Sequence, residues 1–152
     1  MSNSNPKVTV RQDFECMYIL DKVSSDSDNH DIELNAHRYR FEVSVEKRED
    51  DESSRVVEFS DLQKSLNSIL PDESYIYQNK LAGIPAIIGG ILDNAGAKCV
   101  HVDFEICAES LCSWLIHKLQ QNLDDSFPKK FKVVDAILRE NSQCYVSWHI
   151  DE

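Results

Sequence analysis

The sequence is short of positive charge. Among its 152 residues, 27 are aspartate or glutamate and only 16 are lysine or arginine, so the formal net charge is −11. Charge of this sign repels phosphate backbones and anionic lipid headgroups. We therefore expect neither nucleic acid nor a membrane surface as the partner of this protein.

Long apolar runs and paired cysteines are also missing. No apolar run is long enough to span a bilayer, and Met1–Pro6 contains neither a basic nor an apolar segment. The five cysteines are odd in number and form no C-x-x-C pair, which disfavours a disulfide framework or a zinc ribbon. We expect a cytoplasmic protein with free cysteines. Its length fits one domain over residues 1–152.

The clearest pattern that is present is a period-two alternation of apolar and polar residues from His37 to Val45. It predicts a half-buried antiparallel strand over about Ala36–Lys47. Asn35 and His37 are two positions apart, so their side chains share a face about 7 Å apart. That spacing suits a shared metal or substrate. The alternative is that His37 is a histidine at the edge of the core.

Two helices are predicted. The S-x-x-Q capping box at Ser60 starts the first, and Pro71 ends it. Apolar residues at helical spacing predict the second over Ala108–Leu123. The apolar stretch Leu81–Leu92 contains three glycines and a proline, which favours a loop with one or two helical turns that covers apolar surface or makes a subunit contact. The other expected segments are strands at Val8–Leu20, Phe131–Arg139 and Gln143–Ile150, a short strand or extended segment at Val100–Glu105, and a loop at Asp21–Glu33.

The order of the main elements is two strands, two helices and two strands. Two hairpins must pair into one antiparallel sheet, and both helices must cover a single face of it. The sequence therefore predicts an α+β domain with a four-stranded antiparallel sheet.

Four stretches of the sequence carry a more specific pattern. They are Asn35–Val43, similar to H-G-H-N-Y-x-V-x-V; Val56–Leu62, similar to M-V-x-D-F-x-D-L; Cys107–Leu111, similar to P-T-x-E-N-L; and Arg139–Ser142, in the place of an E-T turn. In this order the motifs resemble those of the tunnelling-fold (T-fold) family of 6-pyruvoyl-tetrahydropterin synthase and 6-carboxytetrahydropterin synthase. The resemblance covers most of the chain.

The family places zinc on three histidines, and this sequence departs from that pattern. Tyr18 occupies the first zinc position, Asn35 the second and His37 the third. Zinc prefers three nitrogen, sulfur or carboxylate ligands in tetrahedral array. We therefore expect no zinc and no other cofactor, and the loss of the family's standard mechanism.

The glutamates of the family pattern are kept. Glu140 matches the residue that anchors the pterin ring in the family, where a carboxylate accepts two parallel N–H bonds from an amino-pyrimidinone edge. Glu109 matches the glutamate of the second-helix motif. Its alternative role is that of an acidic residue favoured by the helix dipole.

The resemblance implies an enzyme of altered chemistry. We expect a metal-independent lyase- or cyclase-type catalyst acting on a pterin-like or other heterocyclic substrate. Tyr18, Asn35, His37 and Asp31 would line its reacting end, with His37 moving a proton. The alternative is a non-catalytic paralogue that binds a small molecule or a protein. The resemblance also implies a homo-oligomer, such as a hexamer, with sites between subunits.

Overall fold

A computed structural model describes residues 6–23, 30–48, 56–78 and 83–150, without the side chains of residues 21–23, 30–32 and 83–85. Six strands form a sheet with the order β4-β3-β1-β2-β5-β6. The elements are β1 (Val8–Val23), β2 (His30–Lys47), α1 (Phe59–Ile69), β3 (Ser74–Gln78), α2 (Gly83–Asn94), β4 (Cys99–Val102), α3 (Ala108–Ser126), β5 (Phe131–Arg139) and β6 (Tyr145–His149).

The chain divides into two compact units, and β1 and β2 contribute residues to both. Unit 1 comprises Met1–Asp13, Tyr39–Leu70 and Leu111–Glu152. Unit 2 comprises Phe14–Arg38 and Pro71–Ser110.

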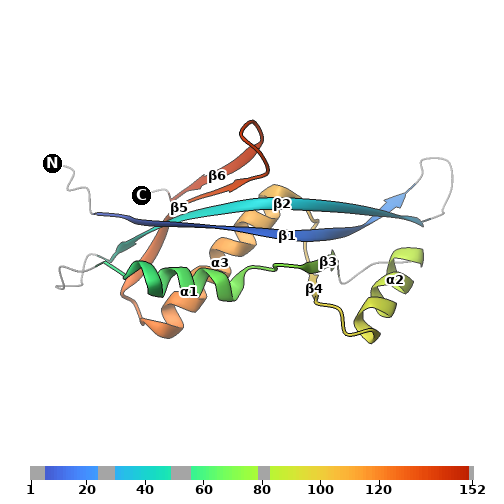
Figure 1. The fold of residues 1–152 in the computed structure, drawn as a ribbon, viewed down its shortest axis with the longest axis horizontal. Coiled ribbons are helices and arrows are strands. Elements are labelled where there is room, and N and C mark those ends of the chain that lie inside the picture. Colours follow the sequence, from blue (N-terminus) through green and yellow to red (C-terminus); the bar gives the residue numbers. More distant parts are fainter. Residues whose placement is uncertain (1–5, 24–29, 49–55, 79–82, 151–152) are drawn as a thin grey trace. The chain divides into compact units, whose positions relative to one another are not determined.

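Unit 1 is a sheet covered on one face by helices. β5 pairs antiparallel with both β2 and β6, and α1 and α3 lie on the same side of the strands (Figure 1). Alternate residues of β2, such as Phe41 and Val43, are fully buried together with Leu66 of α1 and Leu115 of α3. Burial of these apolar side chains stabilises the unit, at about 25 cal/mol per Å² removed from water.

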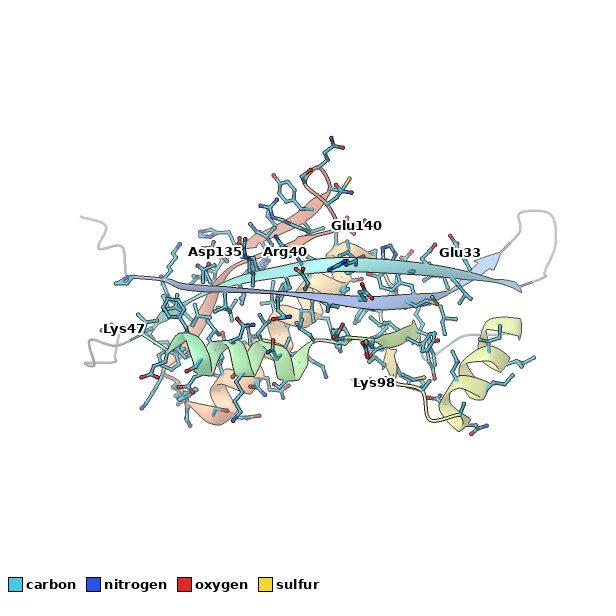
Figure 2. The ribbon with its side chains drawn as sticks, in the orientation of Figure 1. Glu33, Arg40, Lys47, Lys98, Asp135 and Glu140 are labelled. Carbon is cyan, nitrogen blue, oxygen red and sulfur yellow. The ribbon has the colours of Figure 1, made fainter. Side chains whose placement is uncertain are left out.

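The other sheet face of unit 1 is polar. Arg40 and Asp13 form an ion pair at 2.8 Å, and Lys7 pairs with Asp135 at 3.0 Å. Figure 2 labels Arg40 and Asp135 on this sheet. Such a polar face is what the strict alternation along β2 predicts.

Unit 2 is built on parallel pairing. β3 runs parallel to β1, with Cys16 opposite Ser74, and β4 runs parallel to β3, with Tyr75 opposite Cys99. The α+β class is confirmed, while the predicted four-stranded antiparallel sheet gains two short parallel strands. No element was predicted for Asp72–Asn79, because SYIYQ is short and is buried on both faces at Ile76 and Tyr77.

The expected loop at Leu81–Leu92 is wrong, because α2 is a regular helix there. Pro85 lies in its first turn, where a backbone N–H has no intrahelical partner to lose. Gly89 faces Tyr77 so closely that a Cβ would lie 3.3 Å from the tyrosine ring. The glycine is therefore a packing residue rather than a signal for a loop.

Two boundaries also differ from expectation. Helix α1 begins before Ser60, since the Leu62 N–H donates to the Glu58 carbonyl at 3.0 Å and Glu58 is the N-cap, without a side-chain capping bond. β1 and β2 extend into the expected loop Asp21–Glu33, because pairing with a neighbouring strand outweighs weak local propensity. No helix in the described ranges is long and apolar enough to cross a membrane.

Candidate functional site

The candidate site is a hollow of about 490 Å³ in unit 2, lined by residues of β1, β2 and the start of β3. Cys16, His37, Ser74 and Tyr75 are among its lining residues. A volume of this size suits a small molecule. The hollow exists because the parallel β1–β3 pairing sets Ser74 beside Cys16.

The rings of Tyr18 and His37 are in contact beside this hollow. Their ring centroids are 4.4 Å apart, with the planes tilted by 41°. Tyr18 is 3% exposed, whereas His37 is half-buried and lines the hollow. The buried tyrosine ring therefore packs against the imidazole, and part of the imidazole remains accessible from the hollow.

Asn35 and Asp31 were expected beside this pair. Asn35 is half-buried, and its side-chain amide donates to the carboxylate of Glu33 at 3.3 Å. Asp31 falls within β2, but its side chain lies outside the described part of the structure. The structure thus brings together Tyr18 and His37, and it pairs Asn35 with a neighbouring carboxylate.

Charged groups surround the hollow. Arg38 lies 3.9 Å from Glu15, and the Glu15 N–H donates to the Asp72 carboxylate at 2.9 Å. Burial, followed by the nearby charge of Asp72, raises the pKa of the Cys16 thiol to about 12. Cys16 is therefore held as a neutral thiol at physiological pH, and it is a poor nucleophile there.

The two glutamates of the motifs lie on other elements. Glu140 belongs to unit 1, where it follows the last residue of β5 and is exposed; Figure 2 shows it at the turn toward β6. Its N–H donates to the Cys144 carbonyl at 3.0 Å. Glu109 lies in the first turn of α3, where a hydrogen bond from its own backbone N–H, followed by one with Cys107, lowers its pKa.

Comparison with known proteins decides the family. The profile of the 6-pyruvoyl tetrahydropterin synthase family matches residues 7–150. The chain belongs to this family. No curated protein matches the sequence.

Solved structures with the same fold include two of particular interest. An uncharacterized protein from Wolinella succinogenes has a TM-score of 0.60 and 16% identity, over 96% of this chain and 99% of that one. The 6-pyruvoyl tetrahydropterin synthase of Caenorhabditis elegans has a TM-score of 0.54 and 15% identity, over 97% and 98% of the two chains. These similarities confirm the predicted T-fold.

The zinc of the synthase family does not fit the residues found here. A phenol, an amide and one imidazole stand at the three zinc positions, and the phenol ring is buried against the imidazole. Within the described ranges, no group of three histidine, cysteine, aspartate or glutamate side chains could hold a metal ion. We therefore derive no chemical step through zinc.

Several lining residues escaped the sequence analysis. Glu15, Arg38 and Glu73 line the hollow, and Glu73 takes a positive φ of 54° just before β3. Glu15 and Glu73 come together through the pairing of β1 with β3, which are distant in sequence, and Arg38 lies on β2. The local signal that could have revealed β3 is the content of tyrosine and isoleucine in Ser74–Gln78, since both residues are enriched in strands.

Proposed function

We propose that the protein is a cytoplasmic, metal-independent enzyme of lyase or cyclase type that acts on a pterin-like or other fused heterocycle. The observation that carries the proposal is the contact between the Tyr18 and His37 rings beside a hollow of about 490 Å³. Membership of the 6-pyruvoyl tetrahydropterin synthase family supports the ring class of the substrate.

In this proposal His37 moves the proton. An imidazole can both take and give a proton near neutral pH, and the buried Tyr18 ring holds it in one orientation. The Tyr18 hydroxyl, the Asn35 amide and Asp31 complete the reacting end. Hydrogen bonds to an oxygen that becomes negative in the transition state lower the barrier without a metal.

The carboxylate of Glu140 anchors the ring in this proposal. It is exposed in the turn after β5, and it can accept two parallel N–H bonds from an amino-pyrimidinone edge. Glu109 is the second carboxylate of the substrate site. The protein assembles as a homo-oligomer, such as a hexamer, with sites completed between subunits.

One observation favours a second candidate function. Ile87 and Ile91 of α2 are 62% and 61% exposed, and they lie one helical turn apart. Exposed apolar side chains at this spacing suit a protein partner. A non-catalytic paralogue that binds a protein or a small molecule would use this helix.

Ligand binding to metal-free protein tests the proposal. Zinc is removed by a chelator and its absence is measured, and the melting temperature is then followed with pterin and with guanine. A ligand that binds only the folded state raises this temperature, and a concentration 100 times Kd stabilises by about 2.7 kcal/mol. Turnover of bound pterin derivatives is then sought at neutral pH.

Matched variants assign the residues. Glu140→Gln should reduce the pterin-induced shift, whereas Glu105→Gln, an exposed control, should not. His37→Asn should abolish turnover while the shift persists. If neither ring raises the melting temperature, the enzymatic proposal fails. Stoichiometric zinc in the untreated protein would contradict its metal independence.

A further inference from the structure

We propose that unit 1 carries a second ligand site, which binds a small planar aromatic carboxylate. The site is a hollow of about 590 Å³, lined by residues of α3, β5 and β6 and by the segment after β2. It lies within unit 1 and shares no residue with the hollow beside His37. The proposal therefore stands independently of the enzymatic function.

The inner wall of this second hollow is apolar. Ile116 and Val133 are 6% and 2% exposed, and Trp148 and Ile150 are half-buried. Trp148 stands on the helix-facing side of β6, opposite the buried Ala136 of β5. An indole with aliphatic neighbours is a suitable surface for stacking a planar ring.

The remaining wall is basic. Arg48, His117 and Lys132 line the hollow, and no aspartate or glutamate is among the described residues that line it. The carboxylates nearest to these cations, Glu46 and Asp124, are not among the lining residues. An apolar hollow edged by such cations suits an anion with an aromatic body.

Two of these three residues, Lys132 and Arg48, have an acidic partner. Lys132 Nζ lies 3.4 Å from Glu46, and an Arg48 nitrogen lies 3.4 Å from Asp124. Charge-assisted hydrogen bonds between such groups are about 2.7–2.9 Å long. Both contacts are longer than this, although the Arg48–Asp124 contact is still a hydrogen bond, so a ligand carboxylate can compete for the N–H groups of Arg48 and Lys132.

Gln120 of α3 also lines the hollow, and hydrogen bonds hold its side chain in place. Its side chain donates to the Phe131 carbonyl at 3.1 Å and accepts from the Val133 N–H at 2.9 Å. Arg48 donates to the same carbonyl at 3.3 Å. These bonds tie α3 to the start of β5, so the hollow is preorganised for a ligand.

The probe for this site is 2-naphthoate, and 2-naphthamide is the uncharged control of the same shape. Binding is measured by quenching of Trp148 fluorescence in the full chain carrying Trp114→Phe, which removes the other tryptophan. We expect 2-naphthoate to quench Trp148 saturably and to bind at least about tenfold more tightly than 2-naphthamide, the effect of one charge-assisted contact.

Variants with opposite expected signs separate recognition from folding. Lys132→Gln should weaken 2-naphthoate binding by about tenfold, whereas Glu46→Gln and Asp124→Asn should strengthen it about threefold by freeing Lys132 and Arg48. Lys129→Gln, an exposed neighbour outside the hollow, should change nothing. Since Lys132→Gln leaves the nearly buried Glu46 without its partner, the double variant Glu46→Gln/Lys132→Gln serves as the folded reference.

The outcomes are decisive. The site is established if the affinity for 2-naphthoate falls in Lys132→Gln, rises in Glu46→Gln and is unchanged in His37→Asn. Equal affinity for the two probes, shifts of the same sign in both variants, or no saturable quenching of Trp148 overturns it. A result that removes binding in His37→Asn alone would assign the probe to the hollow in unit 2 and would also overturn the proposal.

Discussion

At the scale of single residues, burial decides what the cysteines can do. Cys16 lines the candidate site, yet burial raises the pKa of its thiol to about 12, and burial raises that of Cys112 to about 11. Cys107 and Cys144 are exposed. Because the thiolate is the reactive form, the cysteine at the site is chemically inert and the remote ones are accessible.

Alkylation should reveal this difference. In native protein at pH 8, iodoacetamide should modify Cys107 and Cys144 first, and Cys16 and Cys112 at least about a hundredfold more slowly, since each pKa unit removes a factor of about ten in thiolate. Mass spectrometry of peptides gives the rates. In urea all five cysteines should react alike, and Cys16 reacting as fast as Cys144 in native protein would show that it is not buried.

The sequence pointed to Tyr18 and His37 as neighbours, whereas the residues around them could not be predicted. Tyr18 and His37 stand out because each matches a zinc position of the family pattern, and His37 also lies on a strongly alternating strand. Glu73 and Ser74 enter the site only because β3 pairs with β1. Parallel pairing between segments so far apart leaves no local trace in the sequence.

At the scale of elements, α2 shows that a glycine can have two roles within one helix. Gly89 faces Tyr77, whereas nothing lies within 4 Å of a Cβ built on Gly90. The same stretch also carries the hydrogen bond from Tyr77 to Asp93, and His101 of β4 lies 2.8 Å from the Tyr77 oxygen. These contacts secure the helix to β3 and β4.

Alanine substitution should separate the two glycines. Gly90→Ala should raise the free energy of unfolding by about 0.5–1 kcal/mol, because alanine loses less backbone freedom in a helix. Gly89→Ala should gain less or become destabilising, because its Cβ would press on the Tyr77 ring at 3.3 Å. Urea unfolding measures both. If Gly89→Ala raised the free energy of unfolding as much as Gly90→Ala, the close packing of Gly89 against Tyr77 would be refuted.

Elements with one buried and one polar face were predicted well, whereas α2, whose sequence shows no polar face, was not. β5 and the start of α3 were placed correctly because their apolar residues recur at period two or at helical spacing. α2 was taken for a loop because its apolar residues show no polar face and its glycines favour turns. The reason for those glycines lies in Tyr77, which no local pattern identifies.

At the scale of the whole molecule, each unit carries a carboxylate that titrates below its ordinary range. A hydrogen bond from Tyr77 is the main cause that lowers the pKa of Asp93 in unit 2. Burial alone would raise the pKa of Asp135 in unit 1, but hydrogen bonds from His149 and Lys7 outweigh it and lower the pKa. Both carboxylates are therefore linked to stability in acid.

The difference in pKa between the folded and unfolded states decides how the stability changes with pH. A carboxyl whose pKa is lower in the folded state stabilises that state above the unfolded pKa, about 3.9 for aspartate, and this contribution is lost as the pH falls through the folded pKa. Stability should thus decline below about pH 4. In Asp93→Asn or Asp135→Asn the decline should be shallower, as measured by urea midpoints from pH 6 to pH 2. The exposed Asp103→Asn should retain the slope of the parent protein, and a parental slope in all three variants would remove the assignment.

The register of β2 has a consequence for synthesis of the chain. Phe41 pairs opposite Leu138 and Val43 opposite Ala136, so the strand that completes this part of the sheet is among the last to be made. A ribosome adds about 5–20 residues per second. For several seconds the nascent chain therefore presents an apolar, half-paired strand to the cell, and pairing of such distant segments is slow once they are available.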